Sequence, residues 1–132
     1  MKKPGKKTLT NKLDKIVSRL VRQRGECERC GEQNYSKLQA AHIFSRTYRS
    51  VRWDMLNLLC LCASCHFWGH KNPILFGEFV MDKLGSDNYG ELKKRAVPTK
   101  KWTVSEMQEL YDTLSGKNDN MVGRDICKTM TS

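Results

Sequence analysis

The sequence predicts an α+β fold in which a two-stranded hairpin and a following helix are joined by a four-cysteine zinc site, with further helices on both sides. Two observations predict this fold. Two C-x-x-C pairs, at 27–30 and 62–65, enclose residues 31–61, which contain two short apolar segments. Before and after this region, apolar residues recur every three or four positions, as in amphipathic helices. At 132 residues the chain is short enough to form a single domain.

The amino-acid composition indicates a globular protein whose partner is a polyanion. Apolar residues make up 39% of the chain, and 24 basic residues against 14 acidic ones give a formal net charge of +10. This excess favours a nucleic acid over an anionic membrane, because no long basic helix with a wide apolar face accompanies it. Solubility alone is the alternative explanation of the charge. With no apolar run long enough for a transmembrane helix or a signal peptide, the sequence predicts a cytoplasmic protein.

The N-terminal part of the chain is predicted to be a basic flexible tail, residues 1–9, followed by a helix from Thr10 to about Gly25. The helix is predicted by apolar residues at 3/4 spacing, which are Leu13, Ile16, Val17, Leu20 and Val21. Its outer face carries four basic residues that either contact DNA or only face solvent: Lys12, Lys15, Arg19 and Arg22.

The region between the cysteine pairs is predicted to form a β-hairpin. Its strands are the apolar segments at 38–44 and 56–61, and a polar, arginine-bearing loop, SRTYRSVRWD, joins them. A short helix is expected from about Cys65 to the break at Pro73.

Sequence signals beyond the hairpin predict three more helices. Pro73 suits the first turn of one and Gly85 its end. A second is expected at 87–96, and the capping box Thr103-Val104-Ser105-Glu106 opens the last. The expected organisation is a tail at 1–9, one domain at 10–115 with its core at 27–72, and a disordered tail at 116–132.

Four of the six cysteines predict a structural zinc site. Cys27, Cys30, Cys62 and Cys65 can supply the tetrahedral set of four sulfurs that zinc favours in closed sites. Redox dithiols are the alternative, but the βαβ context of a thioredoxin-like motif is missing. Zinc would supply folding free energy of about 10 kcal/mol, so the zinc-free protein should be partly unfolded. Of the remaining two cysteines, Cys60 is expected to be buried in a strand, and Cys127 to be a free thiol in the tail.

The three histidines indicate a second site, because all of them fall between residues 42 and 70, in the segment that zinc would close onto itself. His66 and His70 are four residues apart, so on a helix both imidazoles project from one face and can share a metal. His42 lies on the first predicted strand, just before the arginine-bearing loop. Asn57 lies at the start of the second strand.

The order of these residues, His42 and then NLLCLCASCH from Asn57 to His66, resembles the HNH endonucleases. The resemblance covers residues 27–72, including both cysteine pairs, and AAHIFSR with RWDMLNLLCLC also resembles phage-associated members such as NinG-type recombination endonucleases. It implies a ββα-metal fold and a metal-dependent DNA endonuclease, encoded by a phage and working inside a bacterial host. It further implies that His42 is the general base and that Asn57 either braces the hairpin loop or orients His42 and the metal. His66, with His70 beside it, would bind the catalytic cation.

Simple chemistry agrees with these implied roles. A histidine with a pKa near 6.5 can take a proton from water at neutral pH, and a divalent cation can stabilise the charge that develops on the phosphate. Imidazole ligands favour Zn²⁺ or a transition metal such as Ni²⁺, whereas phosphate and water oxygens also recruit Mg²⁺ or Mn²⁺. One position departs from the family: many members carry Asp or His just before the base, where this chain has Ala41. Asp54 is the nearest carboxylate that could replace that ligand, although it could instead cap a turn.

Three arginines in the loop after the base are predicted to contact DNA phosphates, to which guanidinium groups can donate two hydrogen bonds. They recur at every third position, as Arg46, Arg49 and Arg52, and the alternatives are a solvated loop or pairing with Asp54. Trp68 is expected to pack beside the site or to stack on a base. The leading interpretation is a DNA endonuclease that nicks or cuts both strands. The alternatives are a zinc-finger DNA-binding module without catalysis and a phage endonuclease for branched DNA, and a protein partner is left open.

Overall fold

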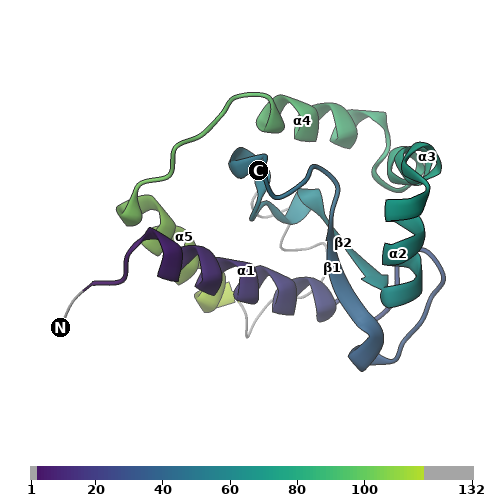
Figure 1. Ribbon diagram of the computed structural model, residues 1–132, viewed down its shortest axis with the longest axis horizontal. Helices are drawn as coiled ribbons and strands as arrows, with labels where there is room; N and C mark the ends of the chain where they lie inside the picture. The colour runs from purple at the N-terminus through teal and green to yellow at the C-terminus, as the bar shows by residue number, and fades with distance from the viewer. Residues whose placement is uncertain (1–2, 118–132) are drawn as a thin grey trace.

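The computed structural model describes residues 3–117 and has the α+β architecture that the sequence predicts (Figure 1). Within these residues a two-stranded antiparallel sheet is surrounded by helices. In chain order the elements are α1 (Lys6–Arg22), β1 (Leu38–His42), β2 (Leu58–Cys62), α2 (Ala63–Lys71), α3 (Pro73–Leu84), α4 (Ser86–Ala96) and α5 (Val104–Lys117). None of the helices in this range is long and apolar enough to cross a membrane.

Helix α1 begins at Lys6, so the prediction that residues 1–9 form a flexible tail is wrong for residues 6–9. Leu9 is fully buried and continues the apolar stripe of Leu13 and Ile16 one turn further toward the N-terminus. The helix therefore extends as far as its apolar face has a core to cover, and this face packs against α5. The second predicted tail, 116–132, is wrong for residues 116 and 117, which belong to α5, and the rest of it, with Cys127, lies outside the described residues.

The predicted hairpin is present, with shorter strands than the apolar segments indicate. Leu38 pairs with Cys62 and His42 pairs with Leu58, so the first cysteine of the second pair ends β2. Both α1 and α2 contact the two strands, and all five residues of β2 are buried (Figure 1). Cys60 is fully buried there, as predicted, and burial together with the nearby Glu28 carboxylate raises the pKa of its thiol to about 11.

The helices after the hairpin begin and end near the predicted signals. Pro73 occupies the first turn of α3, and Gly85 ends that helix at a φ of 81°, in the left-handed region that glycine tolerates. In the capping box, Thr103 Oγ1 accepts a bond from the Glu106 backbone N–H at 3.1 Å, and Glu106 Oε1 accepts one from the Thr103 N–H at 3.0 Å. The reciprocal pair opens α5, as predicted.

Candidate metal centre and histidine cleft

The four predicted zinc ligands come together at the C-terminal end of the hairpin. The sulfur atoms of Cys27, Cys30, Cys62 and Cys65 all lie within 4.8 Å of one another. Cys30 Sγ and Cys62 Sγ are 3.6 Å apart. Four sulfurs bound at about 2.3 Å around a tetrahedral zinc are separated by about 3.8 Å, so this cluster fits zinc.

Both C-x-x-C pairs have the same local geometry. The Cys30 backbone N–H donates to Cys27 Sγ at 3.5 Å, and the Cys65 N–H donates to Cys62 Sγ at 3.4 Å. Burial of Cys27 opposes ionisation of its thiol, but the backbone N–H groups around the sulfur outweigh this effect and lower its pKa to about 7. Burial and the neighbouring thiols raise the pKa of Cys65 to about 12, an effect that a bound divalent cation would reverse.

Arg29, between the first two cysteines, brings a positive charge to the cluster. Its guanidinium donates to Cys65 Sγ at 3.4 Å and lies 3.5 Å from the centre of the Trp68 ring. Four thiolates around a Zn²⁺ ion carry a net negative charge, which this guanidinium would partly offset. Trp68 also packs edge-on against Phe79, and it is not among the described residues that line the histidine cleft, so its packing is on the side of the cysteine cluster. Arg29 is not among the residues predicted from the sequence, although its position between Cys27 and Cys30 indicates that it lies close to the sulfur atoms.

A buried ion pair, also missed from the sequence, attaches the first cysteine pair to β2. Arg24 Nη1 donates to Glu28 Oε2 at 3.0 Å and to the Leu58 carbonyl at 2.7 Å. Glu28 Oε2 in turn accepts from the Cys60 backbone N–H at 2.7 Å. Because these groups also bond the strand backbone, the pair fixes the loop that carries Cys27 in place.

The three histidines line one cleft of about 950 Å³. His42 comes from the end of β1, and His66 and His70 come from α2. The opposite wall includes Asp14 from α1. The fold thus brings together three histidines that the sequence singled out, and it places Asp14, from outside that region, in the same cleft.

His66 and His70 lie side by side, with ring centres 4.8 Å apart and ring planes inclined by 32°. His66 Nδ1 lies 2.8 Å from Gln39 Oε1. With this oxygen as acceptor, Nδ1 carries the proton and Nε2 keeps the lone pair that a metal requires. Burial, with the adjacent His70 and His42, lowers the pKa of His66 and favours the neutral, metal-binding form.

The histidine pair could offer at most two ligand atoms to a metal ion. Within residues 3–117, the four cysteines are the only cluster of three or more His, Cys, Asp or Glu side chains arranged to hold a metal ion. A cation at His66 and His70 would therefore need water or substrate oxygens to complete its coordination.

His42 is held by a single backbone hydrogen bond. Its Nε2 lies 3.0 Å from the Arg52 carbonyl oxygen. A carbonyl only accepts, so Nε2 carries the proton and Nδ1 has the lone pair. Burial, with the positive charges of Arg46 and Arg52, holds the pKa of His42 below its usual value, although the bond to the carbonyl opposes this shift. At neutral pH the ring is uncharged and Nδ1 can accept a proton.

Asn57 is fully buried beneath the loop that follows His42. Its Oδ1 accepts from the Phe44 N–H at 2.7 Å, and its Nδ2 donates to the carbonyls of Phe44 at 2.9 Å and Val51 at 3.1 Å. These bonds close the base of the loop, which matches the bracing role among the two predicted for it. Asn57 is not among the described residues that line the histidine cleft.

Ala41, the position before His42, lines the cleft but has no atom that could bind a metal, and Asp54, the proposed substitute ligand, is not among the described residues that line it. Ala41 is buried against the core. Asp54 Oδ1 accepts from the Leu56 N–H at 3.0 Å, and Oδ2 pairs with Arg95 Nη1 at 2.8 Å. Asp54 is absent from the described residues around the cleft, so the structure gives it the turn-capping role and not the role of a ligand.

The three loop arginines differ in their surroundings. Arg52 donates to Asp14 Oδ1 from Nε at 3.0 Å and to Oδ2 from Nη2 at 2.7 Å, and its side chain is only 12% exposed. Arg46 is 62% exposed, lines the cleft and lies 3.5 Å from the same carboxylate. The Arg49 guanidinium lies 5.7 Å from the Trp53 ring centre. The acidic partner is thus Asp14, where the sequence suggested Asp54.

The Asp14 carboxylate has a third donor, because the Trp53 indole N–H bonds to Oδ1 at 2.8 Å. Burial opposes its ionisation, but the bonds from Arg52 and Trp53 and the arginine charges outweigh burial and hold the pKa of Asp14 below its usual value. The carboxylate is therefore ionised at neutral pH. A single acidic residue in a basic helix was the only signal for it in the sequence.

Comparisons of the chain with models of protein families, with curated proteins and with solved structures find no match. The resemblance to HNH endonucleases therefore depends on the sequence motif alone.

Proposed function

We propose that this protein is a metal-dependent DNA endonuclease of the HNH type, which hydrolyses phosphodiester bonds. One observation carries the proposal. His42, with Nδ1 as its proton acceptor, lines the same cleft as the adjacent pair His66 and His70. A structural or DNA-binding zinc module has no need for a polarised histidine beside two others that can bind a metal.

In the proposed reaction His42 is the general base. A water molecule gives its proton to Nδ1 and attacks the phosphorus, the bond to the 3′ oxygen breaks, and that oxygen takes a proton from solvent. As in the family that the sequence resembles, the product would carry a 5′ phosphate. His66 and His70 would hold a divalent cation (Zn²⁺, Ni²⁺, Mn²⁺ or Mg²⁺), which supplies positive charge against the charge developing on the phosphate.

Arg46 is the loop arginine best suited to bind the DNA backbone. It is exposed and lines the cleft, whereas Arg52 is engaged with Asp14. Its fork of N–H donors can bind a phosphate next to the one that is cut. The net charge of +10 would draw DNA toward this surface before any specific contact forms.

The zinc cluster would support this reaction from outside the cleft. Cys65 is directly followed by His66, so zinc bound to the cysteines would fix the start of α2 and the direction of both metal-binding histidines. Reduced thiols suit the inside of a cell, which agrees with a phage-encoded enzyme acting in a bacterial host.

A second candidate function is a zinc-stabilised DNA-binding module without catalysis. Two observations favour it: Ala41 stands where many HNH enzymes have a ligand, and within the described residues only two protein ligands face the cation. A branched-DNA endonuclease is a special case of the first function, distinguished by its substrate.

Cleavage of supercoiled plasmid separates the two functions. Zinc-loaded protein is tested with Mg²⁺, Mn²⁺ and Ni²⁺ beside His42→Ala of equal zinc content. We expect metal-dependent nicking that is abolished in the variant, while DNA binding is kept. If the unaltered protein binds DNA but cuts it with none of these metals, the non-catalytic module is the correct function.

A further inference from the structure

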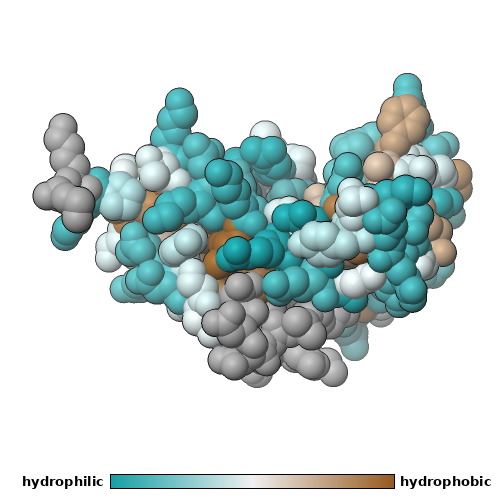
Figure 2. All heavy atoms as spheres, turned by 90° about the horizontal axis from the view of Figure 1, so that it is seen from below, coloured by the Kyte–Doolittle hydropathy of each residue, from teal (hydrophilic) through white to brown (hydrophobic). Residues whose placement is uncertain are grey.

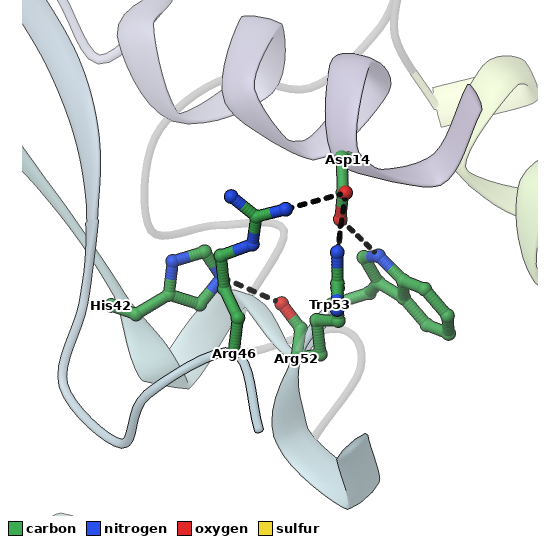
Figure 3. A network of polar contacts seen from close by, with 5 residues as sticks. All are labelled: Asp14, His42, Arg46, Arg52 and Trp53. Carbon is green, nitrogen blue, oxygen red and sulfur yellow. Dashed lines mark hydrogen bonds and ion pairs between the residues drawn. The ribbon is translucent and has the colours of Figure 1, made fainter. Parts of the chain in front are cut away.

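Asp14 belongs to α1, outside the segment that resembles a nuclease, yet it lines the histidine cleft. Its carboxylate accepts two bonds from Arg52, one from Trp53 and a longer one from Arg46 (Figure 3). No other described carboxylate lines this cleft. These bonds distinguish Asp14 from an ordinary surface acid.

The residues that Asp14 holds are the two that flank one particular peptide bond. Arg52 and Trp53 are consecutive, and the carbonyl between them is the one that accepts the bond from His42 Nε2 at 3.0 Å. Figure 3 shows both side chains directed from the loop toward Asp14, with the Arg52 carbonyl facing His42. Fixing the side chains on both sides of this peptide fixes the direction of its carbonyl.

We propose that Asp14 is the positioning residue for His42. Through Arg52 and Trp53 it sets the carbonyl that selects the Nε2–H tautomer and thereby leaves Nδ1 as the proton acceptor. The consequence for cleavage rests on the proposed function. The orientation of His42 itself does not, and it can be measured in protein that cuts nothing.

The chemistry of the acceptor explains why a carboxylate is needed at this position. All the groups that meet Asp14 are N–H donors, and an ionised carboxylate presents two oxygens that only accept. In Asp14→Asn the shape is kept, but one oxygen is replaced by an NH₂ group that faces donors. Each oxygen accepts one bond from Arg52, so at least one Arg52 bond must break whichever oxygen is replaced, and the Trp53 bond is lost too if that oxygen is Oδ1. The peptide between Arg52 and Trp53 is then less well held.

A second ion pair in the same loop provides the matched control. Arg95 of α4 bonds to Asp54 Oδ2 at 2.8 Å, and this pair is about as buried as the pair of Asp14 and Arg52. It attaches a helix to the loop two residues from Arg52 but makes no bond to the peptide that holds His42. Arg95→Gln therefore measures the effect of loosening the loop in general.

The test is nitrogen-15 NMR of the His42 ring in zinc-loaded protein, for Asp14→Asn and Arg95→Gln. We expect the unaltered protein and Arg95→Gln to show one tautomer, protonated at Nε2, and Asp14→Asn to show a mixture of both. Trp53→Phe, which removes one donor and keeps an aromatic ring, should give a smaller shift in the same direction. If Asp14→Asn does not fold, Trp53→Phe tests the inference in its place.

Single-turnover cleavage adds the catalytic readout. Asp14→Asn should lower the maximal single-turnover rate constant by about tenfold or more, with the half-saturating concentration little changed, because a misdirected base loses its near-attack geometry. The inference is overturned if folded Asp14→Asn keeps the single His42 tautomer. If only Trp53→Phe folds, the same result in that variant overturns it. It is also overturned if Arg95→Gln changes the tautomer as much as Asp14→Asn does. If the tautomer shifts but even the unaltered protein cuts no DNA, the inference stands and the proposed function fails.

Discussion

A neutral histidine has one donor and one acceptor nitrogen, and in this protein single hydrogen bonds decide which is which. The Arg52 carbonyl accepts a hydrogen bond from Nε2 of His42, while Gln39 Oε1 accepts one from Nδ1 of His66. The remaining nitrogen is Nδ1 in one ring and Nε2 in the other, and each has a lone pair. Two histidines in one cleft are thereby suited to different tasks, proton transfer and metal binding.

The pH dependence of cleavage tests the role of His42. Burial, with the charges of Arg46 and Arg52, lowers the pKa of this ring below 6.5. A lowered pKa means that the neutral base persists to lower pH, so kcat/KM at saturating metal should fall to half of its maximum only below pH 6.5. A rate that already falls by half at or above pH 7 would contradict this assignment.

At the scale of elements, α1 serves two purposes with its two faces. Its apolar face fills the core, and Leu9, Leu13 and Leu20 are fully buried. Its outer face lines a second hollow of about 560 Å³, together with Tyr111, through four basic side chains: Lys12, Lys15, Arg19 and Arg22. Asp14 and Ser18 border both this hollow and the histidine cleft. Helix α1 lies along the lower side of the molecule in Figure 1, and the view from below in Figure 2 is mostly hydrophilic.

We expect the outer face of α1 to contribute to DNA binding, because its basic stripe adjoins the cleft. Replacing Lys12, Lys15 and Arg19 by glutamine should weaken binding and reduce the slope of log K against log salt by about 0.9 for each DNA phosphate that these side chains neutralise. The control, Lys93, Lys94 and Lys101 replaced by glutamine, removes the same charge from exposed positions elsewhere. Equal weakening in both variants would show that only net charge matters. His42→Ala as the background keeps cleavage out of the measurement.

Elements with a local signal could be predicted from the sequence, and pairings between distant elements could not. The capping box and Pro73 indicated helix starts, and the C-x-x-C spacing indicated the metal cluster, because each depends on neighbouring residues. Asp14 and Arg52 are 38 positions apart. Their pairing depends on how α1 crosses the hairpin, which no periodicity encodes, so the sequence suggested the nearer Asp54 instead. For the same reason the sequence does not predict the hydrogen bonds that attach Arg24 and Glu28 to β2.

At the scale of the whole molecule, the cysteine cluster joins parts of the chain that the small core alone would hold weakly. One cysteine pair follows α1 and the other ends β2 and begins α2, so a zinc ion there connects three elements. The ion pair of Arg24 and Glu28 reinforces this junction from the side of β2. The cleft depends on this junction, because α1, β1 and α2 all contribute to its walls.

Removing zinc should therefore unfold the protein cooperatively and not merely inactivate it. A structural zinc site of this kind contributes about 10 kcal/mol or more to folding, which is comparable to the whole stability of a small domain. We expect a strong chelator to abolish the helical circular dichroism and the thermal transition together, and stoichiometric zinc to restore both. Cys60→Ala, a buried cysteine outside the cluster, should still bind one zinc and respond in the same way. A zinc-free protein with an unchanged Tm would show that the fold depends on its apolar core alone, and that the cysteine cluster has another purpose.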